Sequence, residues 1–354
     1  MKIPVKVLLA VISLLLAVCV VSCTGPEKEQ TKEYNTMSFY NPISPGDAPD
    51  PFITYDPYTD YYYGIYTQGD RLELFRSKHV AELFKGNDSK VIYRAEGTPI
   101  YGDIWAPEMH RGSDGLWYIY TSGRISLEHQ EKRVFIVGSL SFDPFGEWEY
   151  KGMPAPNVFS IDPTVYTDVD GTQYLCYSRV DPQYGQVLDI AKMKNPYTIS
   201  FAKTISHAEL EWELVEPYVG NLAILEGGFF LKKNGRLFLI YSANGCWSNH
   251  YALGVLEWTG DSLLSPDSWT KHPEPLLVYG NGIYGPGHAS FFRSPDGQEV
   301  WCVYHGMLAS NDTVTPAPRY VNVQRVEFDE SGYPVMGLPI GCEVPQAPPS
   351  GEEK

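Results

Sequence analysis

Along this chain, short apolar strands alternate with polar turns in a long unit that occurs five times. Each unit holds an apolar strand, a turn rich in Asp, Asn or Gly, and a second strand rich in aromatic residues. The second strands are separated by 55, 58, 63 and 63 residues, and they begin at Tyr61, Leu116, Tyr174, Leu237 and Val300. This period is too long for a helical solenoid and suits a four-stranded blade. The repeat therefore predicts an all-β fold, a five-bladed β-propeller.

Turn signals between the first and second strands agree with this prediction. Four units carry a dipeptide that tolerates positive φ, namely Asp114-Gly115, Asp170-Gly171, Asn234-Gly235 and Asp296-Gly297. Such pairs predict two-residue hairpin turns. The first unit has a longer turn at residues 56–60. No long apolar stripe with helical spacing is present, so we expect helix to be a minor component.

The first 22 residues have a different pattern. Lys2 and Lys6 precede an apolar run over residues 7–21, which ends just before Cys23. This arrangement predicts an export signal, and it resembles a bacterial lipobox, in which the cysteine becomes the acylated first residue. An ordinary signal peptide or a membrane anchor is the alternative, although the run is short for a full span. We expect an exported bacterial lipoprotein of the cell envelope, at the outer membrane surface or in the periplasm, with an N-terminal lipid in the membrane.

The repeat and the leader together give a domain plan. Residues 1–22 are expected to form the lipoprotein signal peptide, and residues 23–38 a flexible polar tether. The unbroken period favours a single propeller domain over residues 39–345. Residues 346–354 are expected to be a C-terminal tail.

The charge of the chain limits its partners. It has 43 Asp and Glu against 27 Lys and Arg, a net charge of -16, which becomes about -18 once the leader is removed. An acidic body repels polyanions, so we expect no nucleic-acid partner, and uronate-rich pectin is disfavoured for the same reason. Neutral oligosaccharides and polysaccharide side chains remain suitable partners. The four cysteines that follow Cys23 have no CxxC spacing, which favours buried thiols, although one disulfide is left open.

Three of the five units place a carboxylic acid ahead of the first strand: Asp50, Asp162 and Glu226. We expect these residues to occupy the same point of the repeat, and equivalent positions in a closed repeat fold face a common axis. Acidic groups with aromatic neighbours and no nucleophile-base pair suggest hydrolysis of a glycosidic bond. One carboxylic acid then protonates the leaving oxygen, and one carboxylate activates water or attacks carbon. A third carboxylate nearby raises the proton affinity of the acid.

Each of these residues also has a purely structural interpretation. Asp50 and Asp162 both precede proline, and Asp-Pro commonly begins a turn. Glu226 stands between apolar residues, where a buried glutamate is rare without a partner or a function. Glu108 is a weaker candidate, for which we expect a structural hydrogen bond. Glu108 and His110 lack the His-rich context of a metal site.

Taken in order, six short motifs resemble glycoside hydrolase family 43. They are Pro49-Asp50-Pro51-Phe52, Trp105-Ala-Pro-Glu108, Ile161-Asp162-Pro163-Thr-Val-Tyr166, Glu226-Gly227, Gly285-Pro-Gly-His288 and Arg319-Tyr-Val-Asn-Val-Gln. The resemblance covers roughly residues 41–339. It implies a five-bladed propeller that hydrolyses glycosidic bonds with inversion, and it implies no required cofactor.

The resemblance also implies roles for individual residues. Asp50 matches the general base, Glu226 the general acid, and Asp162 the carboxylate that orients the acid and raises its pKa. Trp105 matches an aromatic wall of the sugar site, and Arg319 an arginine that reaches the sugar or the acid site.

The remaining match is His288, which corresponds to a histidine on the propeller axis. The resemblance leaves open that this residue contacts a structural Ca²⁺ near the axis through water. A core tryptophan, a surface ion pair and a satisfied core histidine are the structural alternatives for Trp105, Arg319 and His288.

The substrate is the least determined part of the prediction. Residues 265–275 and the strand end Tyr304-His305 most resemble arabinofuranosidase-type members of the family. We therefore expect exo-acting removal of terminal α-L-arabinofuranose from neutral plant-type glycans or oligosaccharides. A β-D-xylosidase or a β-galactofuranosidase on the same scaffold is the first alternative. A propeller that binds glycans without cleaving them is the second.

Overall fold

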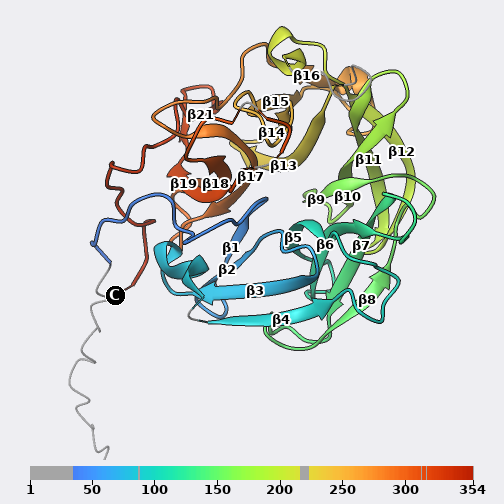
Figure 1. The fold of residues 1–354 in the computed structure, drawn as a ribbon, viewed down its shortest axis with the longest axis horizontal. Helices are drawn as coiled ribbons and strands as arrows, with labels where there is room; N and C mark the ends of the chain where they lie inside the picture. The colour runs from blue at the N-terminus through green and yellow to red at the C-terminus, as the bar shows by residue number, and fades with distance from the viewer. Residues whose placement is uncertain (1–34, 87, 216–222, 312, 316, 354) are drawn as a thin grey trace, which may run out of the picture. The chain divides into compact units, whose positions relative to one another are not determined.

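Five small antiparallel sheets surround a common axis in the unit formed by residues 34–354 (Figure 1). The computed structural model describes residues 35–86, 88–215, 223–311, 313–315 and 317–353. The first two sheets contain β1 (Phe52–Asp56), β2 (Tyr61–Ile65), β3 (Arg71–Ser77) and β4 (Ser89–Arg94), then β5 (Trp105–Arg111), β6 (Trp117–Arg124), β7 (Lys132–Ser139) and β8 (Trp148–Gly152). The next two contain β9 (Ile161–Thr167), β10 (Gln173–Asp181), β11 (Gly185–Asn195) and β12 (Thr198–Ser206), then β13 (Leu225–Lys233), β14 (Arg236–Ala243), β15 (Ala252–Trp258) and β16 (Trp269–Lys271). The fifth contains β17 (Tyr284–Arg293), β18 (Val300–Met307) and β19 (Tyr320–Arg325), and a separate pair is formed by β20 (Glu327–Phe328) and β21 (Pro334–Val335).

The first strands of the five sheets pack beside one another as a closed ring. β1 contacts β5, β5 contacts β9, β9 contacts β13, β13 contacts β17, and β17 returns to β1. The predicted five-bladed propeller is therefore confirmed. Helix is limited, among the described residues, to the short 3₁₀ segments η1 (Val80–Lys85), η2 (Glu211–Leu214) and η3 (Pro266–Ser268).

The ring is closed by a segment from the start of the domain. The fifth sheet has three strands of its own, and residues 39–48 run along the free edge of β19. The Ile43 N–H donates to the Val321 carbonyl at 2.8 Å. The Asn41 side chain donates to the Val323 carbonyl at 2.9 Å and accepts from the Val323 N–H at 3.0 Å. The edge of the last blade is thus covered by chain that precedes the first blade, which leaves fewer unpaired backbone groups.

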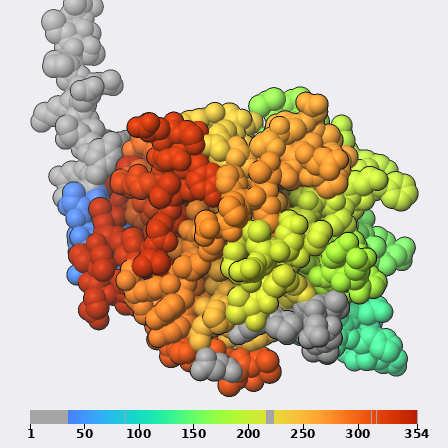
Figure 2. Space-filling model, turned by 90° about the horizontal axis from the view of Figure 1, so that it is seen from above, coloured from blue at the N-terminus to red at the C-terminus, as the bar shows by residue number. Residues whose placement is uncertain are grey.

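The last residues of the chain pack on the domain. Phe39 and Gln346 form a backbone bridge, and the blue N-terminal segment lies against the red C-terminal segment in Figure 2. The Glu352 carboxylate accepts a hydrogen bond from the Val80 N–H at 3.0 Å. Residues 346–353 therefore make defined contacts where the sequence suggests a tail. The predicted signal peptide and Cys23 lie outside the described residues and stay predictions. In the described part of the chain, no helix is long and apolar enough to cross a membrane.

The hairpin turns differ in part from the prediction. Only Asn234 and Gly235 form a two-residue turn, with φ of 50° and 82°, between the paired ends of β13 and β14. In three other blades the glycines Gly115, Gly171 and Gly297 have positive φ, but the aspartates before them do not. Each of these glycines donates its N–H to the carbonyl three residues earlier, at 2.8 to 3.0 Å. The two-residue prediction is wrong there, because an ordinary turn followed by a left-handed glycine makes a longer connection.

Every blade has at least one left-handed residue near the start of its innermost strand. The repeated set is Asp50, Ala106, Asp162, Gly227 and His288, with φ between 46° and 57°, and Asp103 and Gly285 are also left-handed nearby. In four of the blades the pairing of the first and second strands shifts at this point, as in a β-bulge. Bulges re-aim side chains and are common next to active sites. A left-handed conformation is costly for a residue with a Cβ, so its repetition marks a feature imposed by the fold.

This register corrects the expectation that the three carboxylic acids occupy the same point of the repeat. Asp50 and Asp162 share the left-handed position with His288, whereas Glu226 lies one residue earlier and Gly227 takes that position. Glu226 is therefore the counterpart of Trp105, which precedes Ala106 in the second blade.

Gly227 gives a test of this arrangement. A Cβ at this residue would lie 3.1 Å from two ring atoms of His288, and φ is 57°. We expect Gly227→Ala to lower the free energy of unfolding by roughly 2 to 3 kcal/mol, from backbone strain together with the close contact. Gly235→Ala is the matched control, because φ there is 82° and no atom lies within 4 Å of the added Cβ. Equal losses for the two variants in chemical unfolding would show that the contact with His288 is unimportant.

Candidate active site

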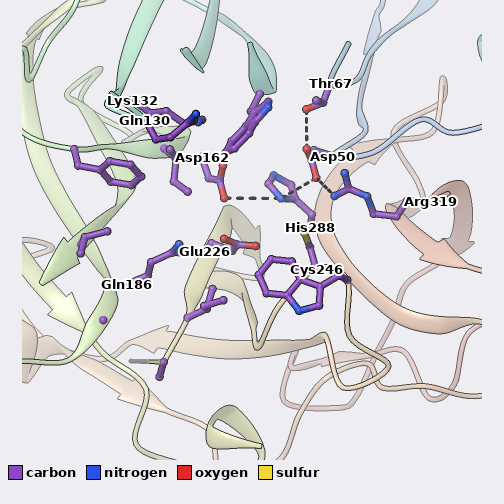
Figure 3. A pocket seen from close by; sticks show the side chains of 18 residues that line it. Asp50, Thr67, Gln130, Lys132, Asp162, Gln186, Glu226, Cys246, His288 and Arg319 are labelled. Carbon is purple, nitrogen blue, oxygen red and sulfur yellow. Dashed lines mark hydrogen bonds and ion pairs between the residues drawn. The ribbon is translucent and has the colours of Figure 1, made fainter. Parts of the chain in front are cut away.

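One cavity of about 860 Å³ gathers side chains from all five blades and the loops around them (Figure 3). Asp50, Asp162 and Glu226 line it together, and so do Trp105, His288 and Arg319. The other lining residues are Thr67, Gln130, Lys132, Phe159, Ile161, Val180, Gly185, Gln186, Ala223, Ile224, Cys246 and Trp247. The six side chains chosen from the sequence thus meet in one place, although 269 residues separate Asp50 from Arg319.

Asp50 is surrounded by donors and positive charge. The Thr67 hydroxyl donates to Oδ2 at 2.7 Å, and Nη1 of Arg319 lies 3.3 Å from Oδ1. Nδ1 of His288 lies 3.4 Å from the same oxygen. Burial by itself raises the pKa of Asp50, but the charges of His288 and Arg319 outweigh it and hold this pKa well below its usual range. Asp50 is therefore an ionised carboxylate at any working pH.

The other two carboxyl groups have the opposite tendency. Burial raises the pKa of Glu226 to about 7 and that of Asp162 to about 8. The charge of Asp50 adds to both shifts, and Glu226 and Asp162 repel each other when both are ionised. They titrate as a pair that retains protons near neutral pH. The cavity therefore holds a carboxylate and a protonated carboxylic acid at the same pH.

Hydrogen bonds orient both members of this pair. The Gly227 N–H donates to Oδ2 of Asp162 at 3.2 Å, so Asp162 contacts the backbone next to Glu226. The Tyr251 hydroxyl donates to Oε1 of Glu226 at 3.0 Å. Each acid is thus held by one defined donor.

His288 lies between two of the carboxyl groups. Its Nδ1 is 3.4 Å from Oδ1 of Asp50 and 4.0 Å from Oδ2 of Asp162 (Figure 3). Its backbone N–H donates to Oγ of Ser242 at 2.8 Å. Within the described ranges, no group of three or more His, Cys, Asp and Glu side chains is placed to hold a metal ion. The residues present do not make a direct ligand set, and a Ca²⁺ held through water stays a prediction.

Trp105 forms part of the cavity wall. Its side chain is 37% exposed, and the Lys132 ammonium lies over the ring, 3.8 Å from the centroid. Lys132 is itself buried and pairs with Asp103 at 3.2 Å. A cation over one face of the indole supports the ring by a cation–π contact and fixes its tilt. The rest of the indole is available to the cavity.

Several residues that line the cavity are not marked by any motif in the sequence. Thr67 follows the second strand of the first blade, Gln130 and Lys132 belong to the second, and Gln186 to the third. Cys246 also lines the cavity, and burial raises the pKa of its thiol well above the usual value. Within the described part of the chain, all four cysteines are free thiols, at Cys176, Cys246, Cys302 and Cys342.

Glu108 is excluded from the cavity wall and forms the structural contact expected of it. Its Oε2 lies 2.7 Å from Nε2 of His110, and the His110 ring packs against the rings of Phe52 and Phe229. The pair is therefore a satisfied polar contact among the innermost strands.

Comparisons with known proteins agree with this geometry. The family model described as "Glycosyl hydrolases family 43" matches residues 39–334. An extracellular exo-α-(1→5)-L-arabinofuranosidase of Streptomyces avermitilis is 33% identical over 87% of this chain and 65% of its own length. The α-L-arabinofuranosidase 43 of Humicola insolens is 32% identical over 79% of this chain and 59% of its own length. The chain thus spans less than two thirds of these two relatives.

A solved structure gives the same result at the level of the fold. The crystal structure of an α-L-arabinofuranosidase from Lactobacillus brevis superimposes with a TM-score of 0.77 at 26% identity. The match covers 86% of this chain and 98% of that protein. Nearly the whole of that protein therefore has a counterpart in this chain.

Proposed function

This chain belongs to glycosyl hydrolases family 43, and we propose that it is an inverting, exo-acting glycoside hydrolase that releases terminal α-L-arabinofuranose. The observation that carries the proposal is the opposite protonation of two buried carboxyl groups in one cavity. Asp50 is held ionised, while burial raises the pKa of Glu226 to about 7. Hydrolysis of a glycosidic bond requires one base and one proton donor of this kind.

In the proposed reaction, Asp50 acts as the base and Glu226 as the acid. A water molecule on the Asp50 side attacks the anomeric carbon, and its proton passes to the Asp50 carboxylate. The bond from that carbon to the leaving oxygen breaks, and the proton of Glu226 passes to this oxygen. Because attack and departure occur on opposite faces, the configuration of the sugar is inverted.

Asp162 is proposed to orient and tune the acid. It contacts the Gly227 N–H, directly after Glu226, and burial together with the charge of Glu226 raises the pKa of Asp162 to about 8, so that the two carboxyl groups titrate as a pair. Arg319 and Thr67 keep the Asp50 carboxylate in place through its two oxygens. We propose that the sugar stacks on the indole ring of Trp105, since a flat apolar face suits contact with C–H groups.

The choice of sugar is supported by the relatives. Both curated relatives described above carry the name arabinofuranosidase, and so does the solved structure that is 26% identical. The walls of the cavity are mostly apolar beyond the carboxyl groups, including Phe159, Ile161 and Trp247. Together with the net charge of -16, this favours neutral oligosaccharides or polysaccharide side chains over polyanionic ones.

The test is proton NMR of the propeller domain with aryl α-L-arabinofuranoside, followed from the first turnovers. We expect the inverted arabinose anomer to form first. Early formation of the retained anomer would contradict the assignment of Asp50 as a base. Cleavage of β-D-xyloside or β-galactofuranoside alone would replace the substrate, and sugar binding without any cleavage would favour a glycan-binding propeller.

A further inference from the structure

Two buried aromatic rings lie directly behind the proposed acid and base. Tyr251 and His305 are both 0% exposed. Their rings are stacked, with centroids 5.5 Å apart and planes only 6° from parallel. The Tyr251 hydroxyl donates to Oε1 of Glu226 at 3.0 Å, and the Asp50 N–H donates to Nδ1 of His305 at 3.1 Å. A single stack therefore touches both carboxylic residues from behind the cavity.

His305 acts on the backbone of the base. Because Nδ1 accepts the Asp50 N–H, this nitrogen carries no proton, and its 3.3 Å approach to Oδ1 of Asp50 is a contact rather than a hydrogen bond. Burial lowers the pKa of His305 to about 4, so the ring is neutral at working pH. Asp50 needs such support, since its φ is 54°.

Tyr251 acts on the acid through a chain with a fixed direction. The His288 N–H can only donate, and it donates to Oγ of Ser242 at 2.8 Å. The Ser242 hydroxyl in turn donates to the Tyr251 oxygen. Burial raises the pKa of Tyr251 well above its usual value, so its own proton stays in place. That proton is left for Glu226, which fixes the direction of the carboxyl group.

The motif that precedes His288 makes room for this tyrosine. A Cβ on Gly287 would lie 2.3 Å from two atoms of the Tyr251 ring. The glycine therefore lets the ring pass against the backbone of β17, beside the residue that begins the hydrogen-bond chain. The position of the Tyr251 ring therefore requires a residue without a Cβ at Gly287.

We propose that Tyr251 and His305 form a positioning pair that holds the Glu226 carboxyl in register with Asp50. Tyr251 orients the acid, His305 secures the backbone of the base, and their stack fixes one relative to the other. Neither residue lines the cavity, so both act through the carboxyl groups. This inference rests on the proposed function, because it assigns the two roles to Glu226 and Asp50.

The direction of the effect on acidity follows from the donor. A hydrogen bond donated to a carboxylate favours its ionised form, so the Tyr251 hydroxyl lowers the pKa of Glu226, and its removal raises that pKa. The other titratable or charged groups of this site remain in place in such a variant: Asp50, Lys132, Asp162, Cys246, His288 and Arg319.

The experiment is the pH profile of kcat for Tyr251→Phe, which keeps the ring and removes the hydroxyl. We expect the midpoint of the alkaline limb to move to higher pH by about one unit. A shift of this size corresponds to the free energy of one hydrogen bond to a charged group. We expect kcat to fall about tenfold with little change in KM, because the misdirected acid mainly affects the transition state. Tyr304→Phe is the matched control, since this tyrosine is equally buried and its hydroxyl donates to Gln324 at 2.9 Å.

A second readout keeps the inference separate from the proposed function. Infrared titration of the Glu226 carboxyl, assigned by its loss in Glu226→Gln, should show the same upward shift without any turnover. One outcome refutes the positioning pair and leaves the proposed function intact. In that outcome the unmodified enzyme cleaves arabinofuranosides, but Tyr251→Phe changes neither the alkaline limb of the pH profile nor the infrared titration of Glu226. If no furanoside is cleaved, the proposed function fails and the infrared shift alone decides the inference.

A further variant serves if Tyr251→Phe does not fold. Ser242→Ala removes the hydroxyl that donates to Tyr251 and so weakens the tyrosine as a donor. We expect a smaller shift in the same upward direction. A downward or absent shift in a folded Ser242→Ala protein would overturn the proposed chain.

Discussion

Glu226→Gln is expected to reduce hydrolysis of arabinosides with poor leaving groups by roughly 1,000-fold, the middle of the usual range for general acid catalysis on a logarithmic scale. Glutamine fills the same space and still accepts the Tyr251 hydrogen bond, so the fold should be preserved. It cannot supply the proton that the leaving oxygen needs. Substrates with an acidic phenol as leaving group need that proton less and should lose much less activity.

The measurement is kcat/KM across a series of aryl arabinofuranosides and one natural oligosaccharide. The alkaline limb is part of the same test, since the acid is active only while protonated. Activity should fall as pH rises through the pKa of Glu226, which burial raises to about 7, and Glu226→Gln should lack this limb. Glu108→Gln is the control, because Glu108 is also buried but bonds to His110 outside the cavity. Full activity of Glu226→Gln on the oligosaccharide would remove Glu226 from the chemistry.

Asp50→Asn is expected to reduce activity on every substrate by roughly 1,000-fold or more, whatever the leaving group. Asparagine keeps the size of the side chain and an acceptor oxygen for the Thr67 hydroxyl. It cannot take a proton from water. It also leaves the partly buried Arg319 without its ion-pair partner at 3.3 Å, so a loss of stability should accompany the loss of activity.

Asp56→Asn separates these two effects. Asp56 is the last residue of β1, the strand that follows Asp50, and it is also buried. It accepts hydrogen bonds from the turn that follows, outside the cavity. Its substitution should alter stability alone. Comparable kcat/KM for Asp50→Asn and the unmodified enzyme on activated substrates would contradict the role of Asp50 as a base, because an activated leaving group does not replace the activation of water.

The sequence predicted the architecture because the fold is a repeat. Five apolar strand pairs with a nearly constant period can bury their faces only against one another, and the ring of β1, β5, β9, β13 and β17 follows from that. The closing segment was not predictable in the same way. Residues 39–48 have no strand pattern of their own, and their hydrogen bonds depend on the free edge of β19, which exists only once the ring has formed.

The turns and the register show a second limit. A dipeptide such as Asp170-Gly171 tolerates several connections, and the length of the paired strands decides among them. The sequence likewise could not show that Glu226 precedes the left-handed position which Asp50 and Asp162 occupy. Which residue takes the left-handed position depends on the register in which the first and second strands pair, and that register is a property of the folded sheet.

The sequence by itself was sufficient to identify the number of blades and the six candidate side chains that the structure brings to one cavity. The reason is that the order and the spacing of the motifs can be read directly from the chain. Only the tertiary structure decided which groups surround those side chains. His305 is 255 residues from Asp50, and Tyr251 is 25 residues from Glu226, so no local pattern connects them. The order of acidity was also decided there, since burial and the positions of His288 and Arg319 determine which carboxyl group keeps its proton.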